Sequence, residues 1–226
     1  MRREASSVIC PHPFAMPSLK YEKQFLKQGC ALVAGVDEAG RGAWAGPVVA
    51  AAVILPLHRP DLLKALKGVN DSKQLTPRQR ERLFDVILSV ALAVGVGGSG
   101  PGEIDREGIV PATRAAMQRA LAMLHPPPEA LLVDAVNLQS LIPLPQRALI
   151  HGDSRSLSIA AASIIAKVSR DRAMAALDAL HPGYGFARHK GYGTAVHQAA
   201  LARLGACTAH RESYAPIAQL MQRPML

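Results

Sequence analysis

Residues 34–42, AGVDEAGRG, are followed by the apolar run 47–55, and the rest of the chain is organised around these two segments. The small and β-branched residues of 31–36 are typical of a buried strand, which here reaches two adjacent carboxylates and a Gly-Arg-Gly turn. Successive side chains of a strand point to opposite faces, so Asp37 and Glu38 can serve one site only if the strand stops there and the backbone bends. We therefore predict a strand that ends in a functional turn.

The turn itself has two interpretations. Gly40 and Gly42 permit positive φ and a close approach of the backbone to a ligand, and Arg41 lies between them. Carboxylates attract cations and such a turn attracts phosphates, which favours a metal held against a nucleic-acid backbone. The alternative is a surface turn capped by Asp37 and Glu38. The apolar strands on both sides of the pair favour the first interpretation.

Composition and charge narrow the class of protein. The 226 residues suit one domain that can bury a sizeable core. Hydrophobic residues make up 49% and charged residues 19% of the chain, which excludes a disordered protein. The net charge is +9 and the pI is near 9.9. Such a charge is typical of a protein with a polyanionic partner, although a generally basic surface would give the same count.

Cysteine usage and hydropathy indicate the compartment. Cys10, Cys30 and Cys207 are widely spaced and odd in number, so neither a disulfide framework nor a zinc site is indicated, and a cytoplasmic location fits. No apolar run approaches the roughly 18–20 residues of a membrane span. Residues 1–29 are rich in proline and lack a signal-peptide core, and we predict a flexible N-terminal extension there, with a turn of helix over 20–28.

The remaining pattern is mixed α/β. We expect strands over 31–37, 47–55, 93–96, 130–133 and 148–151, and helices over 78–92, 111–124, 156–180, 194–204 and 216–222. Thr76-Pro77 supplies an N-cap and a proline at the first helical position. The predicted domain over 30–226 therefore ends in a small helical part, about 181–226.

Four acids stand at the ends of predicted strands: Asp37, Glu38, Asp134 and Asp153. Strand ends on one edge of an open sheet are neighbours, so these carboxylates can converge. Several like charges in one cleft repel each other and raise pKa values unless cations neutralise them. Oxygen ligands without nearby His or Cys favour Mg²⁺ or Mn²⁺ over Zn²⁺. Two such ions ~4 Å apart can activate a water molecule and stabilise the leaving 3′ oxygen of a phosphodiester.

Taken singly, each acid has a simpler interpretation. Asp134 at a strand end is more often a cap or turn residue, and Asp153 stands where the N-cap of the helix over 156–180 is expected. The metal hypothesis therefore depends on all four acids together.

Six motifs follow one another along the chain: GVDEAGRGAWAGPV at 35–48, NDSK at 70–73, VD at 133–134, GD at 152–153, AASIIAKVSRD at 161–171 and HKGY at 189–192. In sequence and order they resemble the bacterial ribonuclease HII family over roughly residues 31–217. The resemblance implies a ribonuclease H-like fold, in which a five-stranded mixed sheet is flanked by helices and followed by a small helical C-terminal part.

The resemblance also implies an activity. It is that of an endoribonuclease which hydrolyses the RNA strand of RNA/DNA hybrids and cuts 5′ to ribonucleotides embedded in duplex DNA, leaving 3′-hydroxyl and 5′-phosphate ends. The family's role in ribonucleotide excision repair and DNA replication is implied with it. We expect a monomer that binds nucleic acid and no membrane.

Site residues follow from the same resemblance. It implies that Asp37, Glu38, Asp134 and Asp153 bind two Mn²⁺ or Mg²⁺ ions, with no separate protein base. The turn Gly40-Arg41-Gly42 would sense the 2′-hydroxyl, the group that separates RNA from DNA chemically. Tyr192 would stack on the sugar of the following deoxynucleotide, and the glycines beside it are expected to leave its backbone mobile and its ring accessible.

Two positions depart from the family pattern. Ala43-Trp44 stands where the family has Pro-Leu, and Ala135 stands where it has glycine after the aspartate. Neither departure removes a predicted ligand. Trp44 is interpreted as a packing residue rather than an added stacking surface.

Other polar residues have weaker assignments. Lys73, Lys167, His189 and Lys190 are predicted to contact the substrate, Lys167 by reaching the cleft from a helix of small residues. A solvated surface side chain is the alternative for Lys73, and for His189 and Lys190 the two interpretations are evenly balanced. Arg170-Asp171 is interpreted as a structural pair, and His197 and His210 as surface or capping residues.

Two competing functions remain. A nuclease of the same fold could act on another substrate, as integrase-like or Holliday-junction enzymes do, but the Gly-Arg-Gly turn and Tyr192 argue against it. A non-catalytic nucleic-acid-binding protein would use the basic surface alone, and the intact acids argue against that.

Overall fold

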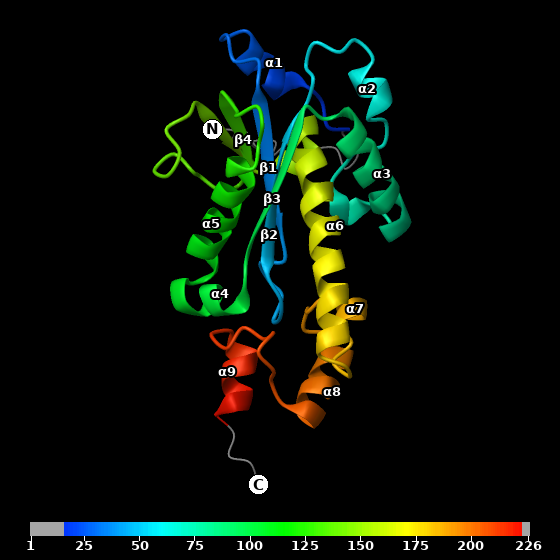
Figure 1. Cartoon of the computed structure of the whole chain (residues 1–226), viewed down its shortest axis with the longest axis vertical. Helices are drawn as coiled ribbons and strands as arrows, with labels where there is room; N and C mark the ends of the chain where they lie inside the picture. Colours follow the sequence, from blue (N-terminus) through cyan, green and yellow to red (C-terminus); the bar gives the residue numbers. More distant parts are fainter. Residues whose placement is uncertain (1–15, 223–226) are drawn as a thin grey trace, which may run out of the picture.

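A five-stranded mixed sheet forms the centre of the computed structural model, which describes residues 16–222 (Figure 1). The strand order is β3-β2-β1-β4-β5, with β1 Val33–Ala39, β2 Val48–Ile54, β3 Ala93–Ser99, β4 Ala130–Asp134 and β5 Gln146–Leu149. The strands β1, β4 and β5 are parallel, whereas β2 is antiparallel to both of its neighbours. The predicted five-stranded sheet is confirmed.

Helices cover both faces of this sheet. The helices of the described residues are α1 Lys20–Leu26, α2 Leu62–Ala65, α3 Pro77–Val90, α4 Pro101–Glu107, α5 Ile109–Ala122, α6 Leu157–Leu180, α7 Phe186–His189, α8 Ala195–Leu204 and α9 Ala215–Met221. Two short 3₁₀ turns, η1 Ser72–Gln74 and η2 Gly152–Ser154, precede α3 and α6. Figure 1 shows α5 on one side of the sheet, α6 and α3 on the other, and α8 and α9 beyond the far end of α6.

The interior strand β2 explains this layering, because both of its faces are buried. Its residues at 48, 50, 52 and 54 pack in one core cluster with Ala116, Met117 and Ala120 of α5. Ala51 and Val53 pack in a second cluster with residues of α3 and α6. A strand covered on both faces reads as a continuous apolar run, which is the sequence pattern of 47–55.

Local signals place the helix ends. Thr76 accepts a hydrogen bond from Gln79 N–H while the Gln79 side chain accepts one from Thr76 N–H, which completes a capping box at α3. Ser156 caps α6 by accepting from Ile159 N–H. Gly35 lets α6 lie directly on β1, since a Cβ there would come within 2.1 Å of the Ser158 carbonyl carbon.

Several predicted boundaries differ from the structure. The strand β5 lies at Gln146–Leu149, two residues before its predicted position, and β3 extends through the predicted glycine end to Ser99. The helix α4, which starts at Pro101, was not predicted because the polar segment 101–107 lacks an apolar period. The segment 56–75, for which no helix is predicted, contains α2 and η1.

Part of the predicted extension over 1–29 is a packed helix. The turn of helix expected over 20–28 is confirmed as α1, but it is buried against the domain rather than flexible. Tyr21 and Phe25 of α1 pack with Val33, Leu132 and Ile159. Glu22 is fully buried, and its Oε1 accepts hydrogen bonds from Ser156 Oγ at 2.6 Å and Ser158 N at 3.0 Å. These partners lie more than 130 residues away, so no local pattern could predict them. The remainder of the extension, 1–15, lies outside the described residues.

The helical C-terminal part has a core of its own. Tyr184, Phe186, Leu201 and Ile217 pack there with Met174 from the end of α6. This core anchors the segment that follows α6 at the end of the sheet where β1 passes into the Gly-Arg-Gly turn. Within residues 16–222, no helix is both long and apolar enough to cross a membrane.

Candidate active site

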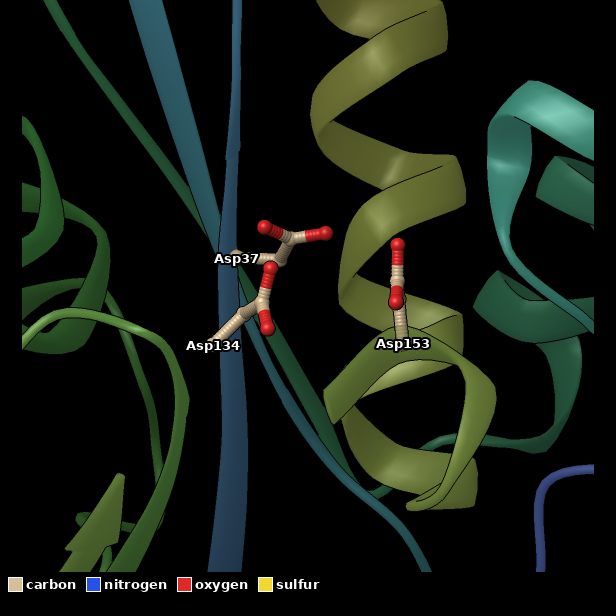
Figure 2. Close-up of side chains that lie close together, drawn as sticks. All are labelled: Asp37, Asp134 and Asp153. Atoms are coloured by element: carbon tan, nitrogen blue, oxygen red, sulfur yellow. The ribbon is translucent and has the colours of Figure 1, made fainter. Parts of the chain in front are cut away.

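Three carboxylates meet at the carboxyl ends of the parallel strands. Asp37 lies near the end of β1, Asp134 is the last residue of β4, and Asp153 lies in η2 after β5. One oxygen from each lies within 4.8 Å of the others. Figure 2 shows Asp37 and Asp134 side by side, with Asp153 facing them from the turn before α6. The parallel order β1-β4-β5 produces this convergence, as predicted for strand ends on one edge.

Glu38 lies beside this cluster, outside the group of three whose oxygens come within 4.8 Å of one another. The strand does not stop at the acids, because β1 pairs with β2 as far as Ala39 opposite Val49. Neighbouring side chains therefore diverge, and the Glu38 carboxylate accepts a hydrogen bond from Arg41 at 3.3 Å. Glu38 Oε2 is buried with no hydrogen-bond partner among the described residues. The strand runs two residues past its predicted end at Asp37, and the chain turns after Ala39, where Gly40 has φ of 94°. Three of the four acids converge.

Burial and mutual repulsion change the acidity of the cluster. Burial, and then the carboxylates of Glu38 and Asp134, raise the pKa of Asp37 well above its ordinary value. Burial raises the pKa of Asp153 to about 6, with Asp71 and Asp134 adding to the shift and Lys73 opposing it. Buried carboxylates that repel one another are stabilised by a bound cation, so this site favours positive charge.

This donor set fits divalent cations. All three residues offer oxygen atoms, and no His or Cys of residues 16–222 joins the group. Such a set of ligands is preferred by Mg²⁺ and Mn²⁺. Asp134 Oδ1 is held by the N–H of Gly152 at 2.7 Å, so the turn before α6 orients it. The alternative assignment of Asp153 as the N-cap of α6 is wrong, because Ser156 fills that position.

Ala135 lies in the left-handed region directly after Asp134, with φ of 51°. Its N–H donates to Leu149 O at 3.0 Å, and the N–H of Val136 donates to Asp134 O. This turn carries Asp134 at the point where the chain leaves β4. Glycine adopts such a φ without strain, which gives a physical reason for the glycine of the family pattern.

A pocket beside the three acids is lined by the turn and by several predicted substrate residues. Its lining includes Glu38, Gly40, Arg41, Gly42, Lys73, Lys167 and Tyr192. Gly40 has φ of +94° and packs on the Arg170 side chain, whereas a Cβ at Gly42 would meet nothing within 4 Å. The turn is therefore tightly packed beneath Gly40 and open at Gly42.

Lys73 is presented to the acids by η1. Its side chain is 80% exposed, and its Nζ lies 3.8 Å from Asp153 Oδ2. Asp71 accepts from the N–H of Lys73, and Arg80 of α3 donates to the carbonyls of Ser72 and Leu75 at 2.9 and 2.6 Å. This bonding holds an exposed cation next to the carboxylate cluster. Sequence reasoning missed Arg80, since nothing near it in sequence marks its role.

The other predicted lysines lie farther from the acids. Lys167 donates to Asp171 at 2.7 Å, and burial lowers its pKa. Lys190 has φ of 54° and donates to the Asp171 carbonyl at 3.2 Å. Both line a second pocket beside the first one, with Arg80 and Arg188. The predicted pairing of Arg170 with Asp171 is absent, because Asp171 pairs with Lys167 and Arg80 while Arg170 binds backbone carbonyls.

His189 is buried and belongs to the fold. Its Nδ1 accepts from the N–H of Gly191 at 3.2 Å, so its Nε2 carries the proton and donates to Tyr184 O at 2.8 Å. Both ring nitrogens are thus engaged inside the protein, which contradicts the expected contact with substrate. The segment is polar in sequence, yet its histidine packs edge-on against Phe186.

His197 and His210 are also buried, which contradicts their assignment to the surface. The N–H of Cys207 donates to His210 Nδ1 at 2.9 Å, so His210 Nε2–H donates to His197 Nε2 at 3.0 Å and His197 Nδ1–H donates to Tyr192 O at 3.0 Å. Burial lowers the pKa of His197 to about 4, which keeps this chain of bonds neutral. The two histidines therefore hold the backbone of Tyr192 in place through this chain of hydrogen bonds.

The glycines around Tyr192 provide close packing rather than mobility. A Cβ on Gly191 would come within 2.4 Å of Ala45 O, and one on Gly193 within 2.1 Å of the Trp44 ring. The Tyr192 ring itself is 39% exposed and lies over the Arg170 guanidinium at 5.5 Å. The expected accessible ring is found, on a backbone that is fixed. The packing role of Trp44 is confirmed.

The sequence and structure are similar to known proteins. The family model described as Ribonuclease HII matches residues 34–217. Ribonuclease HII of Chloroflexus aurantiacus is 55% identical over 209 residues, covering 91% of this chain and 97% of that protein. Ribonuclease HII of Pelobacter propionicus is 55% identical over 196 residues, which cover 87% of each chain.

Two solved structures share the fold. Ribonuclease H2 from Pyrococcus horikoshii superposes with a TM-score of 0.70 at 28% identity, covering 83% of this chain and 96% of that one. Ribonuclease HII of Archaeoglobus fulgidus, solved in a complex with PCNA, gives a TM-score of 0.69 at 28% identity, covering 81% and 95%. The ribonuclease H-like fold expected from the sequence is confirmed.

Proposed function

The chain belongs to the ribonuclease HII family, and from this premise we propose that it is an endoribonuclease. It hydrolyses the RNA strand of RNA/DNA hybrids and cuts 5′ to ribonucleotides in duplex DNA, leaving 3′-hydroxyl and 5′-phosphate ends. The observation that carries the proposal is the convergence of Asp37, Asp134 and Asp153 within 4.8 Å, beside the pocket lined by the Gly-Arg-Gly turn.

Asp37, Asp134 and Asp153 would hold the metal, and Glu38, whose buried Oε2 has no hydrogen-bond partner among the described residues, would be the fourth ligand. Two bound Mg²⁺ or Mn²⁺ ions would activate a water molecule and stabilise the leaving 3′ oxygen. The side chains of the protein would bind and orient the substrate. Lys73, exposed and 3.8 Å from Asp153, would attract the phosphate next to the scissile bond. Lys167 and Lys190 would attract the flanking backbone.

Residues 40–42 and Tyr192 would decide where the cut falls. The turn offers main-chain groups and Arg41 to the 2′-hydroxyl, which only a ribonucleotide presents. Tyr192 offers a ring face to the sugar of the next deoxynucleotide. His189 would position this loop instead of touching the substrate.

The test is cleavage of a labelled DNA duplex with one ribonucleotide, in Mg²⁺, in Mn²⁺ and in chelator. We expect a cut 5′ to the ribonucleotide that requires metal, and no cut in a duplex made of DNA alone. Asp134→Asn removes a carboxylate from the cluster and should lower the rate at least a hundredfold, while Asp61→Asn, an exposed acid far along the chain, should not. Binding without cleavage by the wild type would support a non-catalytic nucleic-acid-binding protein instead.

A further inference from the structure

Two fully buried arginines lie behind the Gly-Arg-Gly turn. Arg170 of α6 and Arg211, which follows α8 in the C-terminal part, are both 0% exposed. Neither forms an ion pair with an acid of the described residues. An ion buried without an opposite charge is costly, so its hydrogen-bond partners must compensate for the lost hydration.

Backbone carbonyls of the segment 40–47 are these partners. Arg211 donates to Gly40 O and Arg41 O at 2.8 Å each, and to Gly46 O at 3.0 and 2.9 Å. Its own N–H donates to Trp44 O at 2.8 Å. Arg170 donates to Pro47 O and Ala45 O at 2.9 and 3.2 Å. The turn is thus bound from behind at almost every carbonyl.

These bonds decide where the amide groups of the turn point. In a trans peptide the C=O of one residue and the N–H of the next are antiparallel. Because the carbonyls of Gly40 and Arg41 point at the buried Arg211, the N–H groups of Arg41 and Gly42 point away from it. In the described part of the chain, neither N–H has a hydrogen-bond acceptor, and both residues line the pocket beside the acids.

We propose that Arg211 is a specificity-determining positioning residue, which presents the Arg41 and Gly42 amides as two fixed donors to the ribose and its phosphate. The inference rests on the proposed function and adds a cause for its selectivity. Arg211 touches no substrate; it acts through the turn. Tyr214 assists, because its hydroxyl accepts from Arg211 at 3.0 Å and donates to Arg41 O at 2.5 Å.

The test compares binding of two labelled duplexes in chelator, one with a single ribonucleotide and one of DNA alone. Arg211→Lys keeps the charge but replaces the three guanidinium nitrogens, which reach three different carbonyls, with a single nitrogen that cannot occupy all three positions. We expect the preference for the ribonucleotide duplex to fall about tenfold, the factor for one weakened hydrogen bond to substrate, with DNA binding unchanged. Amide hydrogen exchange of residues 40–46 should become faster.

Arg203→Lys is the matched control, because Arg203 lies in the same C-terminal part and bonds Gly183 O at the surface. It should leave the preference unchanged. If Arg211→Lys does not fold, Tyr214→Phe provides a milder loss of the same contact, with a smaller fall in preference. An unchanged preference in a folded Arg211→Lys or in Tyr214→Phe would overturn the inference. A wild type without any preference would overturn the proposed function itself.

Discussion

Ala135 shows how a single residue can carry strain at the edge of the site. Its φ of 51° is unfavourable for a residue with a Cβ and ordinary for glycine. Ala135→Gly relieves ~1–2 kcal/mol of strain in the folded state. The more flexible glycine also stabilises the unfolded chain by ~0.5–1 kcal/mol, which opposes this gain, so we expect the free energy of unfolding to rise by about 0.5–1 kcal/mol. Urea denaturation measures it.

Ala175→Gly is the control for this prediction, because Ala175 is exposed in the interior of α6. The same chemical change should there reduce the free energy of unfolding by roughly 0.5–1 kcal/mol. Equal destabilisation by the two substitutions would show that Ala135 is not strained.

Asp153 links the acidity of the site to stability. Its folded-state pKa of about 6 exceeds the ordinary value, so between pH ~4 and ~6 the folded protein holds more protons than the unfolded chain. The free energy of unfolding in chelator should therefore fall as pH rises through this window. Asp153→Asn removes the ionisation and should make the metal-free protein more stable than wild type at pH 7, on the order of 1–2 kcal/mol.

Asp61→Asn serves as the control, because the pKa of Asp61 is shifted in the opposite direction from that of Asp153. Arg59 lowers the pKa of the exposed Asp61, so its carboxylate stabilises the folded state above its unfolded pKa. Its replacement should not raise stability at pH 7. The Asp153 prediction fails if thermal melts in chelator show no pH-dependent difference between Asp153→Asn and wild type.

At the scale of elements, α1 acts as a clamp on the start of α6. Glu22 Oε1 accepts from Ser156 Oγ and from Ser158 N–H, one of the four N–H groups that a helix start leaves without an internal partner. A negative charge there is also favoured by the helix dipole. The element predicted as part of a flexible extension is thus fastened to the helix that follows Asp153.

Glu22→Ala leaves this buried N–H and hydroxyl without their acceptor, and we expect a loss of about 2–3 kcal/mol in the free energy of unfolding. Glu22→Gln keeps an acceptor oxygen and should lose less. Lys23, exposed on the same helix, is the control, and its replacement by alanine should stay within about 0.5 kcal/mol. Denaturant midpoints of the three variants measure these changes. If Glu22→Ala shifted the midpoint no more than Lys23→Ala, the role of Glu22 in holding α1 against α6 would be refuted.

At the scale of the whole molecule, the sheet and the C-terminal part approach the site from different sides. The sheet order supplies Asp37, Asp134 and Asp153 at one edge. The C-terminal part supplies the His197–His210 bonds to Tyr192 and the Arg211 bonds to the turn. The carboxylates are therefore positioned by the sheet, and the selective elements by packing against a second core.

The sequence by itself determined the presence of five strands, the helix start at Thr76, and the acids at strand ends. Each depends on side-chain period, turn residues or caps within a few positions, and the motifs were sufficient to identify the family. It also predicted that four acids converge at one edge of the sheet, and Asp37, Asp134 and Asp153 do so.

Only the tertiary structure decided which polar residues are buried and what they bind. His189, His197 and Arg211 look like surface residues in sequence, and Glu38 looks equal to Asp37. Their roles depend on partners such as Gly40, which Arg211 contacts across 171 positions of the chain. Desolvation of a polar group is set by everything that packs around it, and that environment is created by long-range packing rather than by neighbours along the chain.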